Sequence, residues 1–326
     1  YLRALSLFVV VLAMAVATAV ADLSAEFAGF ETVREVGVSG GKSSYHLDTK
    51  SGVVLPNYLP SFGPGRVRYP YGVNERPSPG GGIGRIFDEG IIGVKVVGGN
   101  LIIRVAGGLD PQAGYYYYGW NAWYGQGDMF ITVQDSAGVR HFGLLNVWAR
   151  GPSGPRILDD SHFGAARDFH VRGGPGGASL EGHLISLTSA DHVVRAGGAG
   201  SYRPNYSPAP EGLDYRAFVQ GGTDLGDANL MLGSTVDVGL GGVNQTWYLQ
   251  TWTFPLGWLS SDPVFAIGLH QTTSCGNDQI GTLLVVPTPA ALILGAVGLG
   301  LVVCIDKGFF RASGRRRGLL GWTGTG

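Results

Sequence analysis

Short runs of strand-forming residues alternate with turn residues along most of this chain, and this pattern limits the fold more than any other feature. Ile91–Val97 and Leu101–Ala106 are separated by a Gly-Gly-Asn segment at 98–100, whose residues accept positive φ in a hairpin turn. Asp128–Val133 and Arg140–Leu145 flank a second polar turn segment. The alternation predicts two β-hairpins.

Further strand-forming runs recur through the chain, and its composition leaves little room for long helices. The sequence contains 56 glycines and 17 prolines among 326 residues, and both residue types disfavour helix interiors. Apolar residues still make up 44%, which is enough to bury a core. We therefore expect an all-β fold, a single jelly-roll-like β-sandwich, over residues 22–286. The additional strands are expected at Phe27–Val38, Leu180–Thr188, Tyr215–Val219, Gln245–Thr253 and Val264–His270.

An apolar segment near the N-terminus predicts export. Leu5–Val20 is almost free of polar residues, follows Arg3, and leads into the small residues Ala19 and Ala21. These are the parts of a secretory signal peptide with a cleavage site after Ala21. Residues 1–21 are therefore expected to be removed from the mature protein.

A second apolar segment, near the C-terminus, predicts a membrane anchor helix. The uncharged run Ala290–Ile305 follows a proline motif and precedes a basic cluster. At about 1.5 Å per residue, about 17 residues cover roughly 25 Å, and a hydrocarbon core of about 30 Å can thin to match. Basic residues hold such an end in the cytoplasm. A buried core helix is the alternative. The residues that define the segment are Pro287, Thr288, Pro289, Arg315, Arg316 and Arg317.

This order of prolines, apolar span and arginines resembles the sorting signal of PEP-CTERM proteins, which Gram-negative bacteria export and process with an exosortase. The family has Glu between the two prolines where this chain has Thr288, and the motif at 286–289 is similar to its Val-Pro-Thr-Pro variants. A tail, 318–326, follows the arginines, whereas the family's signals usually end near them. The resemblance implies a sorting or anchor segment at 287–317, with an exosortase-type enzyme as a partner.

Three internal segments are also similar to surface domains of that family: Leu101–Asp110, Gly127–Val133 with Phe142-Gly143, and His270–Ile280. The resemblance implies an exported protein of the cell envelope or cell surface, anchored in the inner membrane before processing. It implies a structural or adhesive role in the extracellular matrix and no assigned chemistry. A formal net charge of -1 gives no electrostatic basis for binding nucleic acid.

An aromatic cluster at residues 115–124 is the main candidate for a binding surface. Its sequence is Tyr-Tyr-Tyr-Tyr-Gly-Trp-Asn-Ala-Trp-Tyr. Flat ring faces stack on sugar rings, so the cluster suggests a second function, a lectin-like module that binds exopolysaccharide. Packing of the same rings in the core and at a sheet edge is the alternative. The candidate stacking residues are Tyr116, Tyr118, Trp120 and Trp123.

No cofactor is required by these predictions, and calcium is the one metal for which the sequence offers candidate ligands. Calcium takes about six to eight oxygen ligands. Local backbone hydrogen bonding in a turn is the default explanation for the Asn and Asp of Cys275–Asp278, and calcium is the alternative. The oxygen donors considered for calcium are Asp128, Asp135, Asn277 and Asp278.

The sequence predicts no catalytic site. The seven histidines lack the spacing of a zinc motif, and Gly151–Pro155 ends in proline where a nucleophile elbow requires glycine. A glycoside hydrolase is the third function considered, because it needs only two suitably spaced carboxylates, and exported β-sandwiches can hold them. The carboxylates available for that role are Glu181, Asp159, Asp160 and Asp168.

Overall fold

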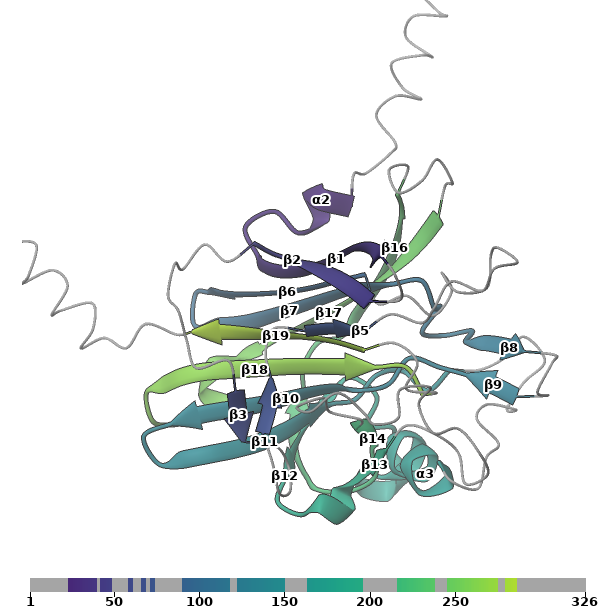
Figure 1. The fold of residues 1–326 in the computed structure, drawn as a ribbon. Coiled ribbons are helices and arrows are strands. Elements are labelled where there is room, and N and C mark those ends of the chain that lie inside the picture. The colour runs from purple at the N-terminus through teal and green to yellow at the C-terminus, as the bar shows by residue number, and fades with distance from the viewer. Residues whose placement is uncertain are drawn as a thin grey trace, which may run out of the picture. The chain divides into compact units, whose positions relative to one another are not determined.

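The protein is built mostly from antiparallel β-strands, with few helices (Figure 1). The chain separates into two compact units, Tyr1–Val285 and Val286–Gly326. All described residues belong to the first unit. The structure, a computed structural model, describes residues 23–39, 42–48, 58–60, 66–68, 71–73, 90–117, 122–149, 163–195, 216–237, 245–274 and 279–285.

The first large sheet has six strands and contains the first predicted hairpin. Gly98 and Gly99 form its turn with φ of 58° and 81°, a backbone region that other residues rarely adopt. The pairing of Val97 with Asn100 closes the turn. In sheet order the strands are β16 (Met231–Asp237), β17 (Gln245–Pro255), β7 (Asn100–Gly107), β6 (Ile91–Val97), β1 (Glu31–Ser39) and β2 (Lys42–Asp48).

The second large sheet has seven strands and contains the second predicted hairpin, whose turn is closed by the pairing of Asp135 with Gly138. In sheet order the strands are β15 (Thr223–Asp227), β12 (His183–Leu187), β11 (Gly138–Leu144), β10 (Met129–Asp135), β18 (Val264–Thr272), β19 (Gln279–Val285) and β5 (Tyr71–Val73). Both hairpin predictions and the all-β class are confirmed.

The remaining elements are short. Three two-stranded sheets pair β13 (Val193–Arg195) with β14 (Arg216–Val219), β3 (Tyr58–Pro60) with β4 (Arg66–Arg68), and β8 (Tyr115–Tyr117) with β9 (Ala122–Tyr124). The helices are α2 (Leu23–Glu26), α3 (Gly164–Arg172) and the 3₁₀ turns η1 (Pro175–Gly177), η2 (Ala190–His192) and η3 (Leu256–Trp258).

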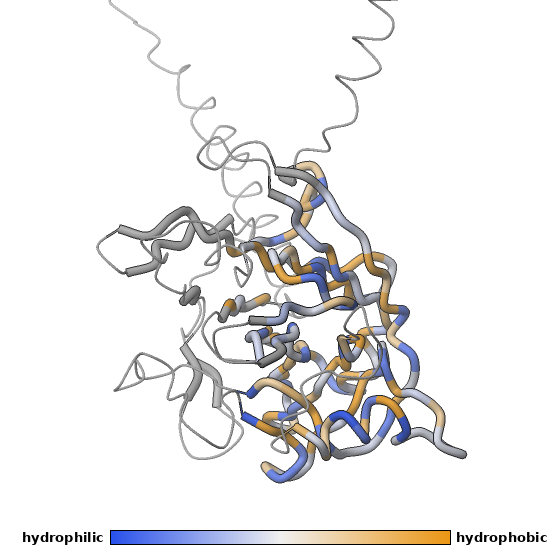
Figure 2. The backbone as a smooth tube through the Cα atoms, turned by 90° about the vertical axis from the view of Figure 1, so that its right-hand side faces the viewer, coloured by the Kyte–Doolittle hydropathy of each residue, from blue (hydrophilic) through white to orange (hydrophobic). Residues whose placement is uncertain are grey.

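Apolar side chains are buried on both faces of the first sheet. In β6 the four residues Ile91, Ile92, Gly93 and Val94 are all buried, so neither face of this strand lies in water. Phe27, from the segment after α2, covers one face, and a Cβ at Gly93 would lie 2.7 Å from its ring. Figure 2 shows apolar and polar stretches alternating along the strands. The segment that follows α2, with Phe27 and Phe30, is therefore part of the core.

The predicted membrane segments lie outside the described residues. Among the residues that are described, no helix is long and apolar enough to cross a membrane. The signal peptide at 1–21, the sorting segment at 287–317 and the tail at 318–326 therefore stay predictions, as does the domain boundary at 286.

Candidate functional site

The aromatic segment forms a small hairpin, β8 with β9, which Figure 1 shows at one side of the β-rich unit. Its register pairs Tyr115 with Tyr124 and Tyr116 with Trp123. Tyr115 and Tyr124 pack against the buried side chain of Leu109. Tyr115 and Tyr124, the pair farthest from the hairpin turn, are thus anchored on the core.

A tight turn before β8 sets the position of this hairpin. Asp110 Oδ1 accepts hydrogen bonds from the backbone N–H groups of Gln112, at 2.8 Å, and Ala113, at 3.1 Å. Gly114 follows with φ of 62°, and a Cβ there would lie 2.7 Å from the carbonyl oxygen of Tyr124. Only glycine allows the two strands to approach so closely at this point.

Tyr116 pairs with Trp123 in the next position of the register, one residue further toward the turn than the Tyr115–Tyr124 pair. The structure therefore places two of the four candidate stacking residues directly across from each other. Tyr118 and Trp120 lie outside the described residues. The glycan-stacking role of these residues stays a prediction.

Tyr248 of β17 is a neighbour of this region that the sequence did not single out. Burial raises its pKa above the ordinary value of 10.0, and the negative charge of Asp110 raises it further. The phenol is therefore protonated at neutral pH and can donate a hydrogen bond. Nothing in the sequence links Tyr248 to Asp110, which lies far away along the chain.

A buried carboxylate connects the start of β10 with the segment after β11, with β14 and with α3. Asp128 immediately precedes β10, and its side chain has no exposed surface. Its Oδ1 accepts the N–H of Asn146 at 2.8 Å, and its Oδ2 accepts the N–H of Val219 at 2.7 Å. Nε2 of His170, on α3, lies 3.0 Å from the same Oδ2. Hydrogen bonds satisfy both oxygens, which is what a buried carboxylate requires.

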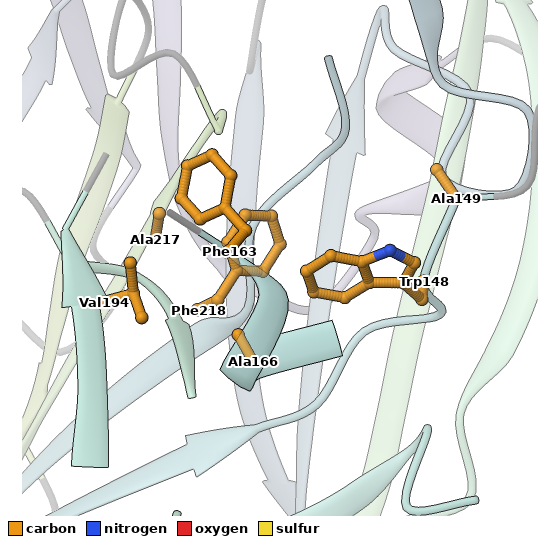
Figure 3. Packing of buried hydrophobic residues seen from close by; sticks show 7 residues of the cluster. All are labelled: Trp148, Ala149, Phe163, Ala166, Val194, Ala217 and Phe218. Atoms are coloured by element: carbon orange, nitrogen blue, oxygen red, sulfur yellow. The ribbon is translucent and has the colours of Figure 1, made fainter. Parts of the chain in front are cut away.

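The rings of Trp148 and Phe218 pack against the His170 ring, and Figure 3 shows both of them within a cluster of buried apolar side chains. The Trp148 and Phe218 rings lie 4.8 Å apart, and the His170 ring stands edge-on to Trp148 at 5.0 Å. Phe163 packs against Phe218 at 5.2 Å. This packing excludes water from the Asp128–His170 contact. The contact has a structural role, because both ring nitrogens of His170 already contact acceptors within the chain.

Asp135 ends β10 and holds the turn that follows. Its Oδ1 accepts the N–H groups of Ala137, at 2.9 Å, and Gly138, at 3.0 Å, while its Oδ2 accepts Ser260 Oγ at 2.6 Å and pairs with Arg140. Burial would raise the pKa of Asp135, but hydrogen bonds from Ser260, Ala137 and Arg140, with the charge of Arg140, lower it below the ordinary value of 3.8.

The calcium candidates are not gathered into one site by the described residues. Asp128 and Asp135 stand at opposite ends of β10, about 20 Å apart at the usual strand rise, so they cannot bind the same ion. Asn277 and Asp278 lie outside the described residues. Within the described ranges, no group of three or more His, Cys, Asp or Glu residues could hold a metal.

The carboxylates considered for a glycoside hydrolase take different positions. Glu181 Oε1 accepts the N–H of Trp148 at 2.8 Å. Asp168 lies on the exposed side of α3 and pairs with Arg167 at 3.3 Å. Asp159 and Asp160 lie outside the described residues. Glu181 and Asp168 thus interact with different partners among the described residues.

Comparison with known proteins adds no relative. No family model, curated protein or solved structure matches this chain. The β8–β9 hairpin, anchored on Leu109 through Tyr115 and Tyr124, remains the candidate binding site.

Proposed function

We propose that this chain is an exported protein of the cell envelope with a structural or adhesive role and no catalytic activity. The observation that carries the proposal is the position of the β-rich unit along the chain. Every described strand lies between Glu31 and Val285, and the apolar segments 5–20 and 290–305 flank this range. A folded domain between a secretory signal and a C-terminal span is the arrangement of a membrane-held surface protein. The PEP-CTERM resemblance favours the same arrangement.

The fold that we propose for residues 22–286 is a single jelly-roll-like β-sandwich. A hydrogen bond between Gln271 of β18 and Gln250 of β17 supports it, because these two strands belong to different large sheets. Both side chains are fully buried, so the contact lies in an interior between the sheets, as in a sandwich core.

Export and anchoring are tested by following the full chain in a Gram-negative host. We expect the surface form to begin at Asp22 on N-terminal sequencing, after cleavage at Ala21. Deleting 287–326 should release the folded domain into the medium, because the span contributes attachment and not core packing. A surface form that still carries Tyr1, or a deletion variant that aggregates in the cell, would contradict the proposal.

Processing by an exosortase-type enzyme is tested separately. In a host that encodes such an enzyme, replacing Arg315, Arg316 and Arg317 with Ala should leave the unprocessed chain in the inner membrane. The matched control replaces Arg167, Arg172 and Arg195 with Ala, which removes the same charge from the described domain. Equal processing of both variants would rule out the arginines as a sorting element.

Carbohydrate binding is the second candidate function, and the β8–β9 hairpin favours it. One face of the hairpin packs on Leu109 through Tyr115 and Tyr124. Tyr116 pairs with Trp123 in the register, and alternation along the two strands predicts that these two rings lie on the other face. Two adjacent aromatic residues on a supported hairpin suit stacking against sugar rings. We propose extracellular polysaccharide as the ligand.

Matched double variants test this second function. Tyr116→Ala with Trp123→Ala should abolish retention on immobilised exopolysaccharide and leave the melting temperature nearly unchanged. Tyr115→Ala with Tyr124→Ala should lower the melting temperature, because these rings contact buried Leu109. Full retention by the first variant would exclude the hairpin as the glycan site. Release of reducing sugar by the wild-type chain would instead favour the third function, a glycoside hydrolase.

A further inference from the structure

Three glutamines are buried where the two large sheets meet. Gln250 of β17 and Gln271 of β18 have no exposed surface, and Gln126, just before β10, is 2% exposed. Gln271 Nε2 donates to the carbonyl oxygen of Gly127 at 2.9 Å and to Gln250 Oε1 at 3.3 Å. The second of these bonds connects Gln271 and Gln250 across the two sheets.

Gln126 and Trp252 belong to the same interior region. Gln126 pairs with Thr273 in an isolated β-bridge. Thr273 lies two residues after Gln271, and alternate residues of an extended segment share one face, so Gln126 and Gln271 lie on the same face as near neighbours. Trp252 lies two residues after Gln250 in β17, and alternate residues of a strand share one face. Trp252 is also fully buried. We refer to Gln126, Gln250, Gln271 and Trp252 as the buried amide cluster.

Several polar atoms of this cluster have no hydrogen-bond partner among the described residues. They are Nε2 and Oε1 of Gln126, Nε2 of Gln250, Oε1 of Gln271 and Nε1 of Trp252. Buried polar groups in folded proteins are almost always hydrogen-bonded, to protein or to ordered water. Five such atoms in one region therefore need a common explanation.

We infer that the buried amide cluster is a binding site for ordered water between the two sheets. The unpartnered atoms comprise three donors and two acceptors, and no member of the cluster carries a charge. An anion would need donors alone and a metal cation would need acceptors alone, whereas water both donates and accepts. The near-zero exposure of all four side chains gives no entry to a larger ligand.

Water at this position would connect segments that are far apart in the sequence. The cluster joins the segment just before β10 to β17 and β18, which come from both large sheets. A water bound to these amides would link the sheets through hydrogen bonds that depend on their relative register. This inference is independent of where the protein is located and of what it binds.

The direct test is a high-resolution crystal structure of the full chain. We expect a water peak within hydrogen-bond distance of at least two of the five atoms. A map in which these atoms contact no water would overturn the inference.

A thermal test uses Gln126→Met, which preserves the length of the side chain and removes both of its polar atoms. If Gln126 binds water, the variant loses those hydrogen bonds and leaves the water's other partners unsatisfied, so its melting temperature falls by several degrees. If Gln126 is instead unpaired, the same change removes a buried penalty and the melting temperature rises. The control, Gln112→Met on the exposed turn before β8, should not shift it. Stabilisation by Gln126→Met would overturn the inference.

Discussion

Glu26 Oε2 lies 2.9 Å from Nη1 of Arg104, and this ion pair joins the first described helix to β7. Arg104 also donates through Nε to Thr251 Oγ1 on β17 at 3.0 Å. The Arg104 guanidinium lies 5.3 Å from the centre of the Phe30 ring, and Lys95 Nζ lies 4.1 Å from it. The segment that directly follows the predicted signal peptide is thus bound to the first sheet by charge and by apolar contact.

The apolar contact should dominate the stability of this attachment. Phe30 is 2% exposed, so Phe30→Ala should lower the free energy of unfolding by about 3–5 kcal/mol. The Glu26–Arg104 pair is partly exposed, and Glu26→Gln should cost no more than about 1 kcal/mol. Urea denaturation of both variants measures the difference. Equal losses would show that the ion pair, and not the ring, holds the segment.

The buried carboxylate Asp128 should be among the most sensitive positions of the domain. Asp128→Ala leaves the N–H groups of Asn146 and Val219 and the ring of His170 without their acceptor. Breaking such a buried network by removing one member costs about 3–5 kcal/mol. The control, Asp168→Ala on exposed α3, should stay within about 0.5 kcal/mol of the wild type. Denaturant melts that give similar losses would contradict a structural role for Asp128.

The local part of this fold could be predicted from the sequence, because its signals are local. The β6–β7 hairpin follows from Gly98 and Gly99, which supply the two positive φ angles of the turn. Helix α3 could not be predicted, because it begins without a capping side chain after Phe163, so the usual start signal is missing. Its first residue, Gly164, disfavours a helix as well.

The partners of the buried side chains could not be predicted, because they are set by sheet register. Asp128 contacts residues 18, 42 and 91 positions away along the chain, and no spacing rule connects them. The aromatic segment at 115–124 could be predicted only in part. Its ring density was visible in the sequence, but the pairing of Tyr115 with Tyr124 and of Tyr116 with Trp123, and the packing of the first pair on Leu109, required the structure.

Asp135 should make the stability of the domain depend on pH in the acid range. Its pKa in the folded state is below the ordinary value of 3.8, which approximates the unfolded state. The carboxylate therefore stabilises the fold above that value, and this contribution is lost as the pH falls through the lowered folded pKa. Asp135→Asn should be less stable than the wild type at about pH 5 and should lose less stability between about pH 5 and about pH 2.5.

The control for this pH dependence is Asp262, whose Oδ2 lies 3.7 Å from Nη2 of Arg140 and whose side chain is 43% exposed. Asp262→Asn keeps the buried contacts of Asp135, so it should retain the wild-type pH profile. Thermal unfolding of the three proteins across this range measures the effect. A wild-type pH profile in Asp135→Asn would assign the acid sensitivity to other carboxylates.

Gly127 should tolerate no side chain, because backbone surrounds it. A Cβ at this position would lie 2.3 Å from the carbonyl oxygen of Thr272 and 2.5 Å from that of Ala217. Neither oxygen can rotate away as a flexible side chain could, so Gly127→Ala must separate strands β18 and β14 from the segment before β10. Such overpacking costs about 1–3 kcal/mol. In a domain of this size, each kcal/mol lowers the melting temperature by about 2–4 °C.

The matched control is Gly164→Ala at the start of α3, where a Cβ meets nothing within 4 Å and alanine favours the helix by up to about 1 kcal/mol. The two variants should therefore shift the melting temperature in opposite directions, and a Gly127→Ala protein that melts with the wild type would show that the strands around Gly127 pack less closely than the structure has them.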